Sequence, residues 1–146
     1  MQQSVSRHEE IKRLLAAKTV QSLVRLPCQY VQYPRNAKFA GREGILEDMH
    51  AHLANSSQEQ RVYSLFGLGG VGKTQITLEY LYRYAEEYSA IFCISADTII
   101  KLGQDIRGSI VRLGLINEDS KFSDQQCRTT FLNWLQETGK SSVSSV

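Results

Sequence analysis

Eight consecutive residues of this chain have the types and the spacing of a phosphate-binding loop. Residues 67–74 read Gly-Leu-Gly-Gly-Val-Gly-Lys-Thr, which matches the P-loop pattern G-x-x-x-x-G-K-[ST] at every position. Glycines allow such a loop to fold back until consecutive backbone N–H groups point at one anion. The Lys73 ammonium would bind the β- and γ-phosphates of a nucleotide, and the Thr74 hydroxyl would ligate Mg²⁺. The residues expected to bind the phosphates are Gly67, Gly69, Gly70, Val71, Gly72, Lys73, Thr74 and Gln75.

The segments on either side of this loop have the patterns that a P-loop requires. Residues 62–66 are rich in β-branched and aromatic side chains, which predicts a buried strand. After the loop, apolar residues recur at helical spacing and predict a helix that runs to about residue 88. The positive N-terminus of that helix would lie under the bound phosphates. The apolar positions are Ile76, Tyr80, Leu81 and Tyr84.

Further elements are predicted on the C-terminal side of this unit. Residues 90–96 form an apolar run that predicts a second buried strand, and residues 102–115 predict a helix. Ser123 and Gln126 have the spacing of a capping box, which predicts a helix that ends at Gly139. The side chains expected to be buried on that helix are Phe131, Leu132 and Leu135.

The N-terminal part is predicted to contain two helical segments joined by extended chain. Residues 8–26 have a helical pattern, and both a packing arm and a surface for a partner remain open for them. Residues 26–38 contain both prolines of the chain, which predicts an extended linker. The next helix follows Gly44 and presents Ile45, Leu46, Met49 and Leu53 on one side.

The composition narrows the class of protein. The 146 residues are 42% hydrophobic and 22% charged, as expected for one globular domain of ordinary size. A net charge of +2 gives no reason to expect a nucleic-acid partner. Without a run of about 18 apolar residues or a secretory leader pattern, no membrane association is predicted either. Cys28, Cys93 and Cys127 are widely spaced and odd in number, which favours reduced thiols in a cytoplasmic protein.

A hydrolytic P-loop enzyme also needs an acidic residue at the end of a second strand, where it holds the water shell of Mg²⁺. Downstream of Thr74, only Asp97 and Asp119 come near this pattern. Asp119 follows a helix and polar residues, which favours a loop. Ser95 and Ala96 separate Asp97 from the apolar part of its strand, so Asp97 is better interpreted as the N-cap of the next helix. No complete catalytic site is predicted.

At this point three segments together resemble an NB-ARC domain, the STAND-class nucleotide switch of NOD-like receptors, in its fungal form. They are residues 39–43 (Phe-Ala-Gly-Arg-Glu), residues 67–75, and residues 90–98. The resemblance covers about residues 30–138. It implies a domain that rests with ADP bound, exchanges ADP for ATP, and then self-associates and signals.

The resemblance also implies an adenine site. Phe39, Ala40 and Arg42 would line the adenine, with alanine in place of the usual valine or isoleucine. Glu43 is expected to support its own loop rather than to contact nucleotide.

The chain departs from this family after residue 138. In similar proteins an apolar strand that ends in the Walker B acid follows, whereas residues 140–146 here are rich in serine. The sensor arginine, the helical lid and the winged-helix histidine of the family are also missing. We therefore expect a domain truncated before Walker B. Its P-loop strand would lack both neighbours, and pairing of residues 62–66 with residues 90–96 or self-association would be the remedies.

The predicted fold is α/β, an incomplete three-layer P-loop NTPase fold with a parallel sheet flanked by helices and an N-terminal helical arm. The predicted divisions are an arm at residues 1–29, a partial NB-ARC domain at 30–140 and a disordered tail at 141–146. The predicted function is binding of ADP or ATP with Mg²⁺ as part of a signalling switch with impaired hydrolysis. A P-loop small-molecule kinase or another NTPase, and a non-enzymatic interaction fragment with a vestigial nucleotide fold, remain alternatives.

Overall fold

The structure is a computed structural model that describes residues 24–54, 60–138 and 142–145. The helix predicted at residues 8–26 therefore falls almost entirely outside the described residues, and its last part, residues 24–26, is not helical. The same holds for most of the predicted arm at residues 1–29. Among the described residues, no helix has both the length and the apolar character needed to cross a membrane.

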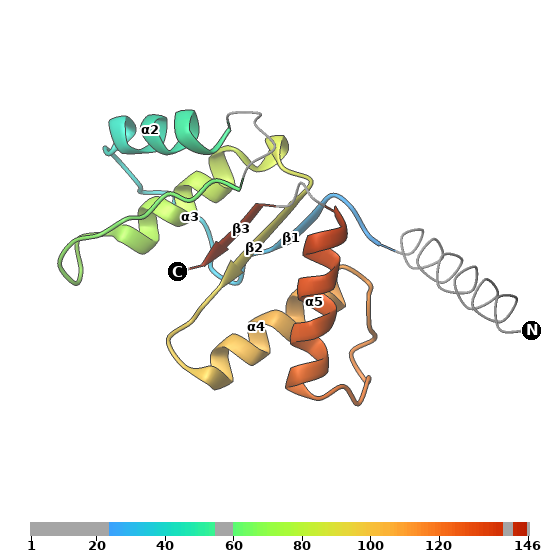
Figure 1. The fold of residues 1–146 in the computed structure, drawn as a ribbon. Coiled ribbons are helices and arrows are strands. Elements are labelled where there is room, and N and C mark those ends of the chain that lie inside the picture. Colours follow the sequence, from blue (N-terminus) through green and yellow to red (C-terminus); the bar gives the residue numbers. More distant parts are fainter. Residues whose placement is uncertain (1–23, 55–59, 139–141, 146) are drawn as a thin grey trace, which may run out of the picture.

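A three-stranded parallel sheet lies at the centre of the fold, in the order β1-β2-β3 (Figure 1). The strands are β1 (Cys28–Tyr30), β2 (Ala90–Ile94) and β3 (Ser142–Ser145). Cys28 pairs with Ala90 on one edge of β2, and Ile91 pairs with Ser142 on the other. All residues of β2 are buried, as the apolar run predicted.

Helices cover both faces of this sheet (Figure 1). Ala90, Phe92 and Ile94 of β2 belong to one hydrophobic cluster, which α4 (Ile99–Arg112) and α5 (Asp124–Thr138) complete. Ile91 and Cys93 belong to a second cluster with α2 (Glu43–Leu53) and α3 (Lys73–Arg83). A strand whose alternate side chains enter two different clusters is the middle of three layers. The α/β class and the parallel sheet flanked by helices are therefore confirmed.

The prediction of a strand at residues 62–66 is wrong, because this segment pairs with no strand of the sheet. Its side chains still alternate: Tyr63 and Leu65 pack against the cluster of α2 and α3, whereas 68% of Val62 and 93% of Phe66 are exposed. The expected pairing with residues 90–96 does not occur, since β1 and β3 occupy both edges of β2. A strand needs a neighbour with free N–H and C=O groups, and the described part of the chain places no such neighbour beside this segment.

Both flanking strands of the sheet come from segments that the sequence predicted to be irregular. β1 lies within the predicted linker at residues 26–38, and β3 lies within the predicted disordered tail at residues 141–146. Both corrections have the same cause. β2 offers two edges of free backbone groups, and short extended segments can satisfy them whatever their side chains are.

The helices agree better with their sequence patterns. Ser123 and Gln126 form the predicted capping box, with Ser123 N donating to Gln126 Oε1 at 2.9 Å and Gln126 N donating to Ser123 Oγ at 3.3 Å. Leu132 was expected to be buried and is 49% exposed, whereas Trp134 is buried in its place. The predicted stop at Gly139 lies outside the described residues. After α3, a short 3₁₀ helix, η1 (Ala85–Glu87), leads into β2.

Candidate functional site

The glycine loop (residues 67–74) connects the extended segment before it to the first turn of α3 and projects from the fold at the left of Figure 1. Gly70 has φ +80° and Gly72 has φ +92°, in the left-handed region that side chains other than glycine rarely adopt. Apart from the adjoining residues of the chain, no heavy atom of the described residues lies within 4 Å of the position that a Cβ would take at Gly69, Gly70 or Gly72. The backbone of the loop is therefore open to an incoming group.

Lys73 folds back over the loop that precedes it. Its Nζ donates hydrogen bonds to the carbonyl oxygens of Gly67 and Leu68, each at 3.0 Å. Thr74 and Gln75, in the first turn of α3, are exposed. One cation and one hydroxyl thus lie at the same end of the helix.

The N-terminus of α3 suits an anion. Gly72 is its N-cap and can supply no side-chain hydrogen bond, so the first N–H groups of the helix have no capping partner of that kind. The first turn of α3 carries no acidic residue, which leaves the positive end of the helix dipole uncompensated. Free amides, an open glycine backbone and the Lys73 ammonium fit a phosphate group, and the exposed Thr74 hydroxyl fits a ligand of a phosphate-bound Mg²⁺.

The segment that the resemblance assigns to adenine lies before α2. Phe39 is half-buried against the cluster of α2 and α3, and Ala40 is exposed. Gly41 and Arg42 are consecutive left-handed residues, with φ of +77° and +66°. For arginine this conformation is strained, and such strain is concentrated at functional sites. The Arg42 carbonyl accepts hydrogen bonds from Ile45 N and Leu46 N, both at 3.1 Å, and so begins α2.

The sequence predicted that Glu43 supports its own loop, and in the structure its partner lies outside that loop, on α3. Its carboxylate forms an ion pair with Arg83 of α3. Arg83 also contacts Glu79, with Nε donating to Glu79 Oε1 at 3.2 Å. The first residue of α2 is thus joined to α3 through one guanidinium.

Glu79 is the centre of this ion-pair network, although only 4% of the residue is exposed. Arg35 binds it in a fork, with Nε 3.0 Å from Oε2 and Nη2 2.8 Å from Oε1. Hydrogen bonding by Arg35 lowers the pKa of the Glu79 carboxyl, burial opposes this change, and Arg83 adds to the lowering. We define the Glu79 network as Arg35, Glu43, Glu79 and Arg83.

Acidification is expected to reduce what Arg35 contributes to stability. Because the folded-state pKa of Glu79 lies below its ordinary value of 4.5, the stabilisation is complete above that value and is lost as the pH falls through the folded pKa. The difference in Tm between the wild type and Arg35→Ala should be largest near about pH 6 and should shrink towards about pH 3 in thermal melts. A difference that stays constant over that range would contradict the assignment.

Asp97, which the sequence analysis weighed as the acid that would hold the water shell of Mg²⁺, follows the end of β2. Asp97 is exposed and accepts a hydrogen bond from Ser95 Oγ at 3.1 Å. The sequence predicted that Asp97 is the N-cap of α4, and this prediction is wrong. That role belongs to Thr98, whose Oγ1 accepts from Lys101 N at 3.1 Å. β3, the strand beside β2, consists only of serine and valine.

Asp105, which the sequence did not single out, is the buried acid at this end of β2. Its Oδ2 accepts a hydrogen bond from Ser95 N at 2.9 Å, and its Oδ1 contacts Lys101 Nζ at 2.9 Å. Gln32 Nε2 also donates to Oδ1. With its oxygens engaged in this way, Asp105 fastens the connection between β2 and α4. The spacing of Lys101 and Asp105 on one helix face was the available signal for this pair.

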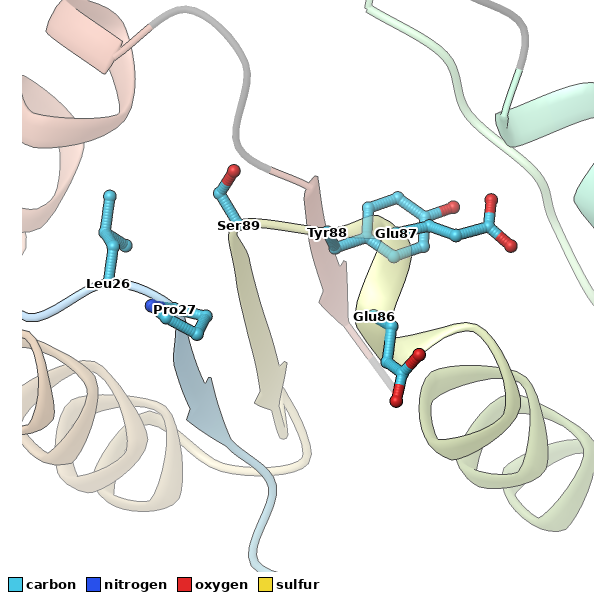
Figure 2. A pocket seen from close by; sticks show the side chains of 6 residues that line it. All are labelled: Leu26, Pro27, Glu86, Glu87, Tyr88 and Ser89. Atoms are coloured by element: carbon cyan, nitrogen blue, oxygen red, sulfur yellow. The ribbon is translucent and has the colours of Figure 1, made fainter.

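A shallow pocket of about 400 Å³ lies elsewhere, at the amino ends of β1 and β2 (Figure 2). It is lined by Leu26, Pro27, Glu86, Glu87, Tyr88 and Ser89. The glycine loop lies at the other end of α3, on the side to which β2 and β3 point in Figure 1. The pocket is unsuited to phosphate, because the negative carboxylates of Glu86 and Glu87 line it.

The structure thus brings the predicted phosphate-binding residues together in one loop and one helical turn. Arg35 and Glu43, which lie on either side of residues 39–42 in the sequence, are attached to the same helix through the Glu79 network. Among the described residues, no hydrogen bond or ion pair joins residues 39–42 directly to the glycine loop. The network itself was missed by sequence reasoning, because Arg35 and Glu79 are 44 positions apart.

Comparison with known proteins gives one informative match. Over 71 residues the chain is 41% identical to a nucleotide-binding leucine-rich repeat (NLR)-like protein of Hyaloscypha variabilis (strain UAMH 11265 / GT02V1 / F). The match covers 45% of this chain and 7% of the relative, so the chain corresponds to a small part of that protein's length. No protein-family model matches the chain, and no solved structure matches it significantly.

Proposed function

We propose that residues 30–140 are the nucleotide-binding part of an NLR-type signalling switch, a partial NB-ARC domain that binds ADP or ATP with Mg²⁺. The glycine loop binds the phosphates, residues 39–42 bind the adenine, and the Thr74 hydroxyl is the protein's ligand to Mg²⁺. The observation that supports this most is the position of an open glycine backbone and Lys73 at the uncapped N-terminus of α3.

The similarity to an NLR-like protein supports the same proposal. That relative is named for nucleotide binding, and its name agrees with the resemblance carried by residues 39–43, 67–75 and 90–98. Self-association in a longer homologue and a cytoplasmic location belong to this proposal as well.

Hydrolysis by this chain is expected to be slow. Bound Mg²⁺ would neutralise phosphate charge, but its water shell needs a carboxylate, and β3 carries none. Asp105 cannot substitute while its oxygens hold Ser95 N and Lys101. The residues present therefore suit binding and retention of nucleotide rather than turnover.

The test is calorimetric titration of the folded, monomeric chain with ADP and with ATP, each with Mg²⁺. We expect one nucleotide per chain. At a concentration 100 times its Kd the nucleotide should stabilise the fold by about 2.7 kcal/mol. Absence of heat with every adenine nucleotide would refute the proposal. Rapid multiple-turnover phosphate release would instead indicate a P-loop enzyme of another kind.

A further inference from the structure

We infer that Glu79 is a positioning residue for nucleoside recognition: through the Glu79 network it fixes residues 39–42 relative to the glycine loop. This inference rests on the proposed function. Glu79 would contact neither adenine nor phosphate. It acts through Arg35 and Glu43, which flank the adenine segment in the sequence.

The first step is that α3 holds this part of the chain at three places. The Tyr82 hydroxyl donates to the Tyr33 carbonyl at 2.7 Å. Glu79 binds Arg35, and Arg83 binds Glu43. Positions 79, 82 and 83 are three and four residues apart, so their side chains lie on one face of the helix. The segment between Arg35 and Glu43 is therefore attached to that face at both of its ends.

The second step is that few other contacts fix residues 39–42, apart from the two hydrogen bonds by which the Arg42 carbonyl begins α2. Asn36 makes a local turn, with its carbonyl accepting from Phe39 N and its Oδ1 accepting from Lys38 N, each at 3.0 Å. Within the adenine segment only Phe39 packs against the core. An exposed segment with a left-handed Gly41 and Arg42 depends on its anchors for its position.

The third step is that the same helix begins at the glycine loop. Lys73 is the first residue of α3, and Glu79 follows six positions later on the same uninterrupted helix. An α-helix rises about 1.5 Å per residue, so the two residues are separated by about 9 Å along its axis. The helix α3 therefore begins at the glycine loop, and the side chains on one of its faces hold both ends of the adenine segment. Misplacement of the segment should weaken binding of the nucleoside and leave binding of phosphate unchanged.

The experiment compares ADP with inorganic pyrophosphate, which has the phosphates of ADP but no nucleoside. Calorimetry gives the Kd of each ligand, with Mg²⁺, for the wild type, Glu79→Gln and Arg35→Ala. We expect the ratio of the pyrophosphate Kd to the ADP Kd to fall about tenfold in both variants, while pyrophosphate binding stays within about twofold. A purely structural role would weaken both ligands together and leave the ratio unchanged.

The control is Lys101→Gln, which removes the ion pair with Asp105 on α4 and a hydrogen bond to Gln32, both outside residues 35–43. Its ratio should equal that of the wild type. If Glu79→Gln does not fold, Arg35→Ala decides, because the Arg35 side chain is 51% exposed. An unchanged ratio in a folded variant that still binds ADP overturns this inference and leaves the proposed function standing. If the wild type binds neither ligand, the proposed function fails and the inference fails with it.

Discussion

Replacing Lys73 with alanine is expected to weaken ADP binding about 100-fold, which corresponds to about 2.7 kcal/mol. The ammonium already lies against the glycine loop, bonded to the carbonyls of Gly67 and Leu68. A phosphate would replace these two neutral acceptors with charged ones. Hydrogen bonds between charged groups are about twice as strong as neutral ones, and each contributes about 1.5–3 kcal/mol.

The loss should be visible in two measurements. Calorimetry gives the change in Kd directly. In thermal melts, a concentration of ADP that stabilises the wild type by about 2.7 kcal/mol should stabilise Lys73→Ala by only about 0.4 kcal/mol. Lys121→Ala, which removes an exposed lysine from the loop before α5, is the control and should bind like the wild type. Binding by Lys73→Ala within about threefold of the wild type would exclude the glycine loop as the phosphate site.

Replacing Phe92 with alanine is expected to lower the free energy of unfolding by about 3–5 kcal/mol. Phe92 is fully buried in the middle of β2. Its ring meets Phe131 edge-on at a centroid distance of 5.2 Å and meets Trp134 edge-on at 5.8 Å. The substitution therefore leaves a cavity between the sheet and α5. Domains of this size have about 5–15 kcal/mol of stability in total, so the loss is severe.

Phe66→Ala is the control, because it removes the same atoms from a side chain that is 93% exposed. Urea titrations measure the free energy of unfolding of both variants, and the effect of Phe66→Ala should stay within about 0.5 kcal/mol. A cost similar to that of Phe92→Ala would show that residues 62–66 are buried, as they would be if they formed the strand that the sequence predicted.

The elements that could be predicted from the sequence are those whose signal is local. The apolar run of β2 and the helical spacing of Leu46 and Met49 each occupy one continuous segment. The capping box of Ser123 and Gln126 is equally local. The glycine loop was located by its pattern alone, although the chemistry of that pattern remains a prediction.

The errors concern partners that are distant in the sequence. Whether residues 62–66 or residues 28–30 form a strand depends on which of them reaches a free edge of β2, and their own side chains do not encode this. The fork between Arg35 and Glu79 likewise depends on the packing of a loop against α3. Glu79 and Arg83 have a helical spacing, but nothing in that spacing indicates a third partner.

The glycine loop leads directly into α3, and Glu79 lies further along the same helix. This arrangement restricts which insertions and deletions the region can accept in evolution. An α-helix turns about 100° per residue. Inserting or deleting a single amino acid between positions 73 and 79 would turn Glu79, together with Arg83 four residues later on the same helix, by that angle relative to the glycine loop. The Glu79 carboxylate would then no longer face Arg35 while the loop keeps its place. A substitution leaves this angular relation unchanged, whereas a change in length would separate the two halves of the proposed site in a single event.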